Sequence, residues 1–362
     1  GYSVQYLASS GYSNTRSLKR IRSDAEVARS FARVARETKR MPDVIVASMP
    51  SIDLAYQSMR FGAEKNIPVV VDVRDLHPDL FVDMAPRFLR PAFWLATLGM
   101  RSRVNRALSG ADAIWGNTDG FVEWGCKGAG RARREHDRTF PIAYEPVELT
   151  EAEQVEANRK WDDQGFFKSD DINIVFFGSL SQSFDFQQIF DAAVQLEAAG
   201  TRHRFYFFGR GAYEAQIAAH CAASRNSHYL GWAVASDLQT AMARSHIGLA
   251  PYLPISNYIE NLPNKPTEYM SGGLGVATAL DRGRLVDILE ETGAGFSYGS
   301  SQDLVRQLSH LADDPAALST MRNAARRAFA EKFDRQSQSQ GMMAAIEALV
   351  EDHRRQPHTN GA

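Results

Sequence analysis

The chain has 362 residues, of which 44% are hydrophobic and 23% charged, a composition typical of globular proteins. This length exceeds what one ordinary hydrophobic core supports, so we expect two domains. The formal net charge of −2 argues against a globally basic, nucleic-acid-binding protein. Cys126 and Cys221 have neither metal-binding spacing nor the pattern of a disulfide framework. We therefore expect no metal site, and a protein that works in the reducing cytosol.

Residues 1–40 carry many more basic than acidic side chains: Arg16, Lys19, Arg20, Arg22, Arg29, Arg33, Arg36, Lys39 and Arg40 against Asp24, Glu26 and Glu37. Such a surface can bind a phosphate group or an anionic membrane. It can equally be the solvated face of a helix, and the sequence leaves both interpretations open. No apolar run approaches the roughly 20 residues that span a bilayer.

Strand-like apolar runs alternate with amphipathic helical runs, which predicts parallel sheets with crossover helices. In the first half we expect strands at residues 4–7, 43–48, 68–73 and 113–115, and helices at 24–40, 51–66 and 93–108. The Gly- and Arg-rich residues 125–134 are predicted to form an exposed loop, and residues 150–165 a polar helix that connects the domains.

The second half repeats this alternation. We expect strands at residues 172–177, 204–208, 229–230, 247–251 and 276–280, and helices at 187–199, 213–224 and 238–244. The chain then ends in helices at 315–333 and 336–352 and a polar tail. The pattern predicts an α/β protein with two doubly wound domains, residues 1–150 and 151–334. Residues 335–362 would form a helix that packs back towards the first domain, and a loose tail.

Ligands of open parallel sheets bind beyond the carboxyl ends of the strands. Three predicted strands run into Gly178-Ser179, Gly209-Arg210 and Pro251, so we expect these loops to line one cleft. A glycine there lets backbone N–H groups approach a phosphate. Taken singly, each glycine is more often only a turn residue.

The segment from Glu260 to Glu268 carries the clearest chemistry. Asn264 is predicted to cap a helix that ends at the pair of glycines following it. The positive end of this helix, together with Lys265, suits a diphosphate, and the two carboxylates suit the hydroxyls of two sugars. The alternative is a capping residue followed by a solvated glutamate.

This segment, with the residues up to Thr278, resembles the donor signature of the retaining GT-B glycosyltransferases of family 4. The resemblance covers nearly the whole chain and includes short motifs at Gly178-Ser-Leu, Phe208-Gly-Arg-Gly211, Gly231-Trp232 and Ala250-Pro-Tyr252. In the first half, residues 71–78 are similar to the VRDLWP segment of bacterial surface-polysaccharide members.

The resemblance implies two Rossmann-like domains that face each other across a cleft. It implies transfer of a hexose-type sugar from a nucleotide-diphosphate sugar, with retention of configuration and without a metal or other cofactor. Glu268 would bind the ribose, Glu260 the donor sugar, and Trp232 would lie by the base. Because the leaving phosphate would help to deprotonate the acceptor, positive charge near the diphosphate is the main catalytic requirement.

The chain departs from the family in two places. Many members have an Arg and a Lys after the first strand of the donor domain, whereas residues 179–185 contain no basic residue. We therefore expect Lys265 and Arg210 to supply the charge, together with Arg74 from the other domain. The family's first strand, its Gly-rich loop and its first helix would precede Gly1, so the first domain is expected to lack that strand.

The acceptor-side candidates are Asp72, Asp75 and His77, and Arg74 stands where many relatives have a histidine. Asp75 is the expected contact to an acceptor hydroxyl, and a structural Asp–Arg pair is the alternative interpretation. Similar relatives build polysaccharides on lipid carriers, which implies a glycan or lipid-linked acceptor and a cytoplasmic enzyme at the inner face of the plasma membrane.

The apolar residues 80–95 are flanked by Arg87, Arg90, Arg101 and Arg103. This pattern is typical of a segment at a membrane interface, and also of a helix packed on the core, which we favour. Two other functions stay open: a GT-B-fold sugar-nucleotide epimerase and a non-catalytic nucleotide-sugar-binding subunit. An NAD dehydrogenase is disfavoured because Gly209-Arg-Gly211 lacks a third glycine at the required spacing.

Overall fold

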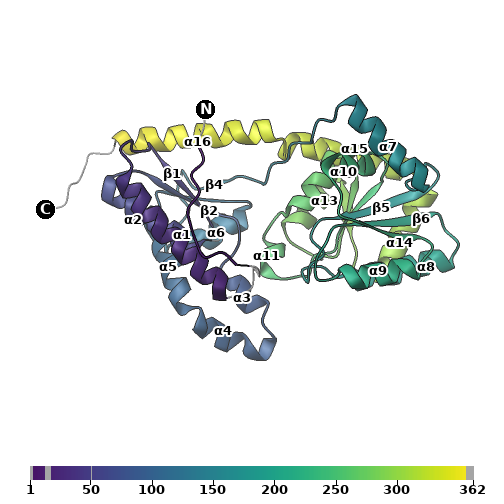
Figure 1. Cartoon of the computed structure of the whole chain (residues 1–362), viewed down its shortest axis with the longest axis horizontal. Coiled ribbons are helices and arrows are strands. Elements are labelled where there is room, and N and C mark those ends of the chain that lie inside the picture. The colour runs from purple at the N-terminus through teal and green to yellow at the C-terminus, as the bar shows by residue number, and fades with distance from the viewer. Residues whose placement is uncertain (1–2, 13–17, 50, 356–362) are drawn as a thin grey trace. The chain divides into compact units, whose positions relative to one another are not determined.

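The computed structural model describes residues 3–12, 18–49 and 51–355 (Figure 1). Contacts divide the chain into two compact units. Unit 1 comprises Gly1–Pro141, Ile255–Glu260 and Gln338–Ala362, and unit 2 comprises Ile142–Pro254 and Asn261–Ser337. The first boundary between the units thus lies after Pro141, whereas the sequence placed it after residue 150. The segment Ile255–Glu260 belongs to unit 1 although it stands between two parts of unit 2 in the chain.

Unit 1 is built on a four-stranded parallel sheet whose strands follow chain order: β1 (Ile45–Met49), β2 (Val69–Val73), β3 (Ala113–Gly116) and β4 (Arg138–Thr139). Apolar side chains of three helices cover one face of this sheet: α2 (Ile52–Lys65), α5 (Leu98–Ser109) and α6 (Asp119–Gly128). On the other face, Leu349 of α16 (Arg335–Arg355) packs against Val70 and Trp115. Because both faces are covered, every residue of β2 and β3 is buried.

The start of unit 1 differs from the sequence prediction. The strand expected at residues 4–7 is wrong, since residues 3–12 form neither helix nor strand and Val4 and Tyr6 are exposed. A strand needs a paired neighbour, which a local apolar pattern does not show. Helix α1 (Leu18–Glu37) packs on α2 through the rings of Phe31 and Phe61. Arg16 and the tail from residue 356 onwards lie outside the described residues, while residues 353–355 belong to α16.

The single helix expected at residues 93–108 is two helices, α4 (Arg90–Ala96) and α5, separated at Thr97. The hydroxyl of Thr97 donates a hydrogen bond to the carbonyl of Trp94 at 3.0 Å. The short helices α3 (Asp79–Asp83) and η1 (Arg87–Leu89) precede α4. None of these three short helices has a buried residue, so packing of this apolar segment on the core, which the sequence favoured, is wrong.

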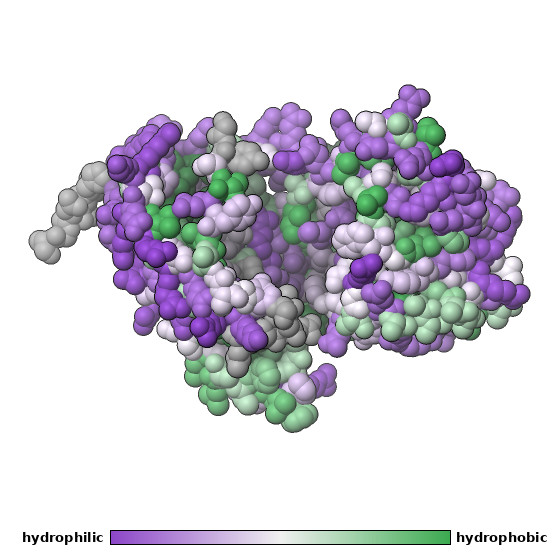
Figure 2. Space-filling view, viewed as in Figure 1, coloured by the Kyte–Doolittle hydropathy of each residue, from purple (hydrophilic) through white to green (hydrophobic). Residues whose placement is uncertain are grey.

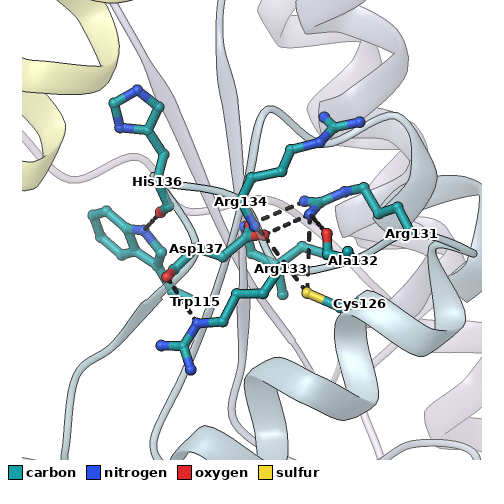
Figure 3. A network of polar contacts seen from close by, with 9 residues as sticks. Trp115, Cys126, Arg131, Ala132, Arg133, Arg134, His136 and Asp137 are labelled. Carbon is teal, nitrogen blue, oxygen red and sulfur yellow. Dashed lines mark hydrogen bonds and ion pairs between the residues drawn. The ribbon is translucent and has the colours of Figure 1, made fainter.

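The exposed loop predicted at residues 125–134 is wrong for its first four residues and confirmed for residues 129–134, which form neither helix nor strand and are mostly exposed. Helix α6 continues to Gly128, and Cys126 is buried. Beyond the helix, the buried carboxylate of Asp137 accepts hydrogen bonds from the guanidinium of Arg131 and from the backbone N–H groups of Ile114 and Arg134 (Figure 3). Burial opposes ionisation of Asp137, but these donors hold the pKa of the carboxyl below its usual value. The network anchors the segment to β3.

Unit 2 is built on a six-stranded parallel sheet in the order β10-β9-β8-β5-β6-β7. The strands are β5 (Ile172–Phe177), β6 (His203–Phe208), β7 (Ser227–Gly231), β8 (Ile247–Ala250), β9 (Gly275–Thr278) and β10 (Gly295–Ser297). The strand order reverses between β5 and β8, which makes this the switch point where ligands of doubly wound sheets bind. The sequence did not predict β10.

Eight helices accompany the strands of unit 2: α7 (Glu151–Gln164), α8 (Phe186–Ala198), α9 (Glu214–Ala222), α10 (Ala235–Ala243), α12 (Asn264–Ser271), α13 (Arg284–Thr292), α14 (Ser301–Asp313) and α15 (Pro315–Lys332). Helix α7, expected to connect domains, packs within unit 2, where Trp161 donates to Thr240. The sequence missed α13 and α14. The whole is an α/β fold with two parallel sheets, and no helix in the described part of the chain is long and apolar enough to cross a membrane.

Candidate functional site

In unit 2 the loops that follow β5, β6 and β7 are hydrogen-bonded side by side. The N–H of Gly178 donates to the carbonyl of Phe208 at 3.1 Å, and the N–H of Leu180 donates to the carbonyl of Arg210 at 2.9 Å. The N–H of Gly209 donates to the carbonyl of Gly231 at 2.7 Å. Two of the loops that the sequence expected around one ligand site, those after β5 and β6, are therefore neighbours at the carboxyl edge of the sheet. The third, at Pro251 after β8, also adjoins the loop after β5, because the carbonyl of Pro251 accepts a hydrogen bond from the N–H of Asp185 at 2.8 Å.

Glycine is required where two of these loops meet. Gly209 has φ +129°, and a Cβ atom there would lie 1.8 Å from the carbonyl oxygen of Gly178. Residues with side chains rarely adopt this conformation. The atom that a Cβ would overlap belongs to the backbone of Gly178, so no side-chain movement could relieve the overlap. These two glycines thus form a bare backbone surface beside the switch point.

Helix α12 is held against this edge by Tyr269, which is fully buried. Its hydroxyl donates to the carbonyl of Leu249 at 3.1 Å and accepts from the N–H of Phe177 at 3.4 Å. Its ring fits over Gly248, where a Cβ would lie 2.2 Å from the ring. The donor-signature helix is thereby tied to β5 and β8.

The predicted N-cap is wrong. Asn264 is the first residue of α12, its side chain is exposed, and Pro263 occupies the capping position without a side-chain hydrogen bond. Proline holds φ near −65°, and its side chain has no acceptor atom. Pro263 can therefore start the helix but cannot accept a hydrogen bond from the first backbone N–H groups of α12. The amino end of α12 therefore keeps backbone N–H groups that no side chain caps.

Lys265 lies in the first turn of α12 and packs against the glycine surface. Its Nζ atom lies 4.8 Å from the ring centre of Phe184 and 5.5 Å from that of Phe176. Burial lowers the pKa of the ammonium group, and the nearby charge of Glu268 partly offsets this. No carboxylate within the described ranges forms an ion pair with Lys265. A partly buried cation without a paired carboxylate suits an anionic ligand.

Glu268 lies one turn further along α12. Burial raises the pKa of its carboxyl, and Lys265 opposes that rise. Burial and then the charge of Glu268 raise the pKa of Tyr144, whose hydroxyl accepts a hydrogen bond from Gln239 at 3.5 Å. Tyr144 thus joins the surroundings of Glu268, although it stands in an irregular segment with no sequence signal that could have identified it.

Three predicted donor contacts lie on the solvent side of the same loops. Ser179 and Arg210 are exposed, and Trp232, directly after β7, is 70% exposed. A large exposed indole is free to stack on a planar group.

In unit 1, Asp72 near the end of β2 and Arg74 directly after it form a closed pair. Asp72 accepts from Nε of Arg74 at 2.7 Å and from the hydroxyl of Ser48 at 3.3 Å, while Arg74 also donates to Asn117. The charge of Arg74 is thus largely neutralised inside unit 1. This geometry agrees with the structural interpretation of the pair, although Oδ1 of Asp72 is buried without a hydrogen-bond partner in the described part of the chain.

Asp75 accepts a hydrogen bond from the amide of Asn257 at 3.3 Å, and Asn257 accepts one from the N–H of Leu76 at 3.0 Å. Burial raises the pKa of Asp75, which moves it towards that of a general base. His77 is buried against the edge of Phe81, and burial lowers the pKa of its imidazole to about 4. His77 is therefore neutral near pH 7.

Glu260 follows α11 (Ser256–Ile259) and belongs to unit 1, whereas Glu268 belongs to unit 2. The hydroxyl of Thr118 donates to the carbonyl of Glu260, and a Cβ on Gly120 would lie 2.2 Å from Oε2 of Glu260. Glu260 and Glu268, which the sequence predicted to bind the same donor, are thus held in place by residues of different units. No group of His, Cys, Asp or Glu among the residues described could hold a metal ion.

Comparison with known proteins gives one family and a set of similar folds. Residues 171–314 match the family model "Glycosyl transferases group 1". No curated protein sequence matches the chain significantly. Among solved structures, HepE from Anabaena in complex with UDP has a TM-score of 0.67 and 14% identity, over 89% of this chain and 82% of that one.

Two further structures share the fold. The alpha,alpha-trehalose 6-phosphate synthase of Burkholderia multivorans has a TM-score of 0.64 and 12% identity, over 92% of this chain and 77% of that one. A putative UDP-N-acetylglucosamine 2-epimerase from Listeria monocytogenes has a TM-score of 0.59 and 11% identity, over 94% and 82%. At these identities the likeness concerns the fold alone.

Proposed function

We propose that this chain, which carries a glycosyltransferase group 1 domain and has the two-sheet fold of GT-B glycosyltransferases, is a retaining hexosyltransferase of family 4. Its donor would be a nucleotide-diphosphate sugar, and its acceptor a hydroxyl of a polysaccharide or lipid-linked intermediate in cell-surface glycan synthesis. The observation that carries the proposal is Lys265, a partly buried cation placed between the glycine surface and the uncapped end of α12.

Each donor-side residue has a role that fits its surroundings. The backbone of Gly178, Ser179 and Gly209 would let the diphosphate approach the sheet edge, and the amino end of α12, with Asn264, would face it. Lys265 and exposed Arg210 would neutralise its charge. Glu268 would accept hydrogen bonds from the ribose hydroxyls, and Trp232 would stack on the base. The UDP bound to HepE makes uracil the first base to test.

The proposed reaction exchanges two bonds on one face of the sugar. The bond from the anomeric carbon to the diphosphate breaks, the acceptor oxygen bonds to the same carbon, and the acceptor proton passes to a phosphate oxygen. Negative charge grows on the leaving diphosphate, so Lys265 stabilises the transition state more than the ground state. Asp75 would orient the acceptor hydroxyl by accepting its hydrogen bond, and Glu260 would contact the donor sugar.

Arg74, Asp72 and His77 have lesser parts in this scheme. The hydrogen bonds of Arg74 to Asp72 and Asn117 suit it to shaping the acceptor side more than to neutralising phosphate. The scheme uses no metal and no organic cofactor. We expect a chelator to leave the transfer rate unchanged.

We further propose that the protein works in the cytoplasm, bound peripherally to the inner face of the plasma membrane. The helix α4 exposes Phe93, Trp94 and Leu95, and no Asp or Glu occurs between residues 84 and 111. Figure 2 shows the resulting hydrophobic patch on the part of unit 1 where α4 lies. Apolar side chains with arginines around them favour an anionic lipid surface. Flotation with anionic vesicles at low salt tests this, and absence of binding would remove the membrane from the proposal.

The donor site is tested by incubating the protein with UDP-sugars and a lipid-linked acceptor and measuring released UDP and product. Lys265→Ala should lower turnover at least 100-fold, because one charge contact to a transition-state anion contributes about 3–4 kcal/mol. Lys168→Ala, on the amino side of β5, is the control and should retain activity. Near-normal turnover of Lys265→Ala would contradict the proposal.

The same incubation separates the two other functions. The fold shared with the Listeria protein keeps an epimerase as the second candidate. An epimerase would change the configuration of the sugar on UDP without consuming acceptor. A non-catalytic subunit would bind UDP-sugars, seen as a rise in Tm, and release no UDP.

A further inference from the structure

Unit 1 contains a pocket of about 520 Å³ that none of the roles above uses in full. One face of α6 lines it with residues spaced three and four apart, and the same spacing on α3 supplies a second wall. These residues are Gly120, Glu123, Trp124 and Lys127 on α6 and Asp79, Val82 and Asp83 on α3. Because residues three and four apart lie on the same side of a helix, each of the two helices lines the pocket with a continuous row of its residues.

The pocket combines indole rings with charged groups. Nε1 of Trp124 donates to Asp79 at 2.7 Å, and Arg101 forms an ion pair with the other oxygen of that carboxylate. The guanidinium of Arg101 also lies 5.8 Å from the ring centre of Trp94. These contacts fix the orientation of both rings and of the Arg101 side chain without filling the pocket.

Several polar groups of the pocket remain available to a ligand. Lys127 and Glu123 are exposed on α6, and Glu260 faces the same space. Carboxylates and cations that converge beside indole rings suit a saccharide, whose hydroxyls need both acceptors and donors and whose C–H faces pack on aromatic rings.

The pocket adjoins the exposed apolar surface of α4, because Trp94 belongs to both. Phe93 and Leu95 flank Trp94 on that helix, and Arg87 and Arg90 stand at its start. The polar head of an amphiphilic molecule could occupy the pocket while its apolar tail lies against the exposed surface of α4. A soluble sugar would use only the pocket.

We propose that this pocket binds the saccharide head group of a lipid-linked acceptor, with its tail or the surrounding lipid along α4. The inference rests on the proposed transferase function and adds the residues that select the acceptor. Trp94, Trp124, Arg101 and Lys127 would be specificity determinants on the acceptor side, separate from the Asp72–Arg74 pair.

The test uses a matched pair of probes: monosaccharides linked through diphosphate to an undecyl chain, and the same sugar diphosphates without the chain. Binding to the full chain is measured by calorimetry without donor, and transfer is measured with UDP-sugar. Trp124→Phe keeps an aromatic ring but removes the N–H that orients Asp79, so it should weaken binding of both probes at least fivefold. Lys127→Ala should do the same through lost charge.

Phe93→Ala combined with Leu95→Ala should weaken the lipid-linked probe at least tenfold and leave the chain-free probe unchanged. Trp232→Ala, in unit 2, is the matched control and should alter UDP affinity without altering acceptor binding. Equal acceptor binding in wild type, Trp124→Phe and Lys127→Ala, with unchanged Tm values, would overturn the inference. Acceptor binding without any transfer would instead contradict the proposed function and leave this site standing.

Discussion

Lys265 occupies the space that a side chain on Gly178 would need. A Cβ on Gly178 would lie 2.8 Å from Cε and 2.9 Å from Nζ of Lys265, and the backbone there has φ +120°. The ammonium group can therefore take this position only because residue 178, in the loop after β5, has no side chain. This packing links the first loop of the sheet to the donor-signature helix.

Gly178→Ala is expected to lower UDP affinity at least tenfold, because the methyl group displaces Lys265 and strains the backbone. Isothermal calorimetry with UDP measures the effect. Gly200→Ala is the matched control: φ is +68° there, and no atom lies within 4 Å of an added Cβ. It carries backbone strain without touching the site and should leave affinity unchanged. Equal losses in both variants would mean that strain alone is responsible.

Trp232→Ala should weaken UDP binding by about 5- to 150-fold, since stacking of one base on an aromatic side chain contributes about 1–3 kcal/mol. The indole is 70% exposed, so its removal should barely affect stability. Val234→Ala removes another exposed apolar side chain of the same loop and provides the control. Unchanged affinity in Trp232→Ala would place the base elsewhere.

Acid should destabilise both units through buried histidines. Burial lowers the pKa of His77 in unit 1 and of His246 in unit 2 to about 4. The unfolded chain takes up these protons near pH 6.5 and the folded one only near pH 4, so stability is lost as pH falls through that window. The full loss is on the order of 3 kcal/mol per histidine.

Urea unfolding of the full chain at several pH values measures this dependence. His246→Asn should flatten the decline between pH 6.5 and 4, since an amide oxygen can replace Nδ1 as acceptor for the N–H of Asn173. A variant curve parallel to that of the wild type would show that His246 contributes nothing to it.

Asp137→Ala should reduce the free energy of unfolding by about 3–5 kcal/mol, because it leaves the largely buried guanidinium of Arg131 without its partner. Asp43→Ala removes an exposed ion pair with Arg354 and should cost less than about 1 kcal/mol. Thermal and urea unfolding compare the two. Similar effects of both variants would mean that the network in Figure 3 does not stabilise unit 1.

Much of unit 2 could be predicted from the sequence. The run of apolar residues 172–177 was identified as β5 at its observed bounds, and α12 ends at Gly272 as its glycines predicted. Such segments are recognisable because both their hydrophobic period and their terminating residues are local. Asn264 failed as a cap because Pro263 starts the helix one residue earlier.

Unit 1 was harder to predict because its features depend on distant partners. Residues 4–7 alternate like a strand but have no strand beside them. Residues 129–137 look like a free loop, yet the carboxylate of Asp137 holds them to β3. The pocket beside Trp124 involves residues without any local motif.

The sequence by itself determined the succession of strands and helices, the glycines after β5 and β6, and the charged pair Lys265 and Glu268, because these follow from neighbours in the chain. Only the tertiary structure decided that Arg74 is neutralised by Asp72, that Glu260 belongs to unit 1, and that α4 stays exposed. Burial and ion pairing depend on which surfaces meet after folding, and a residue's neighbours in sequence do not fix its neighbours in space.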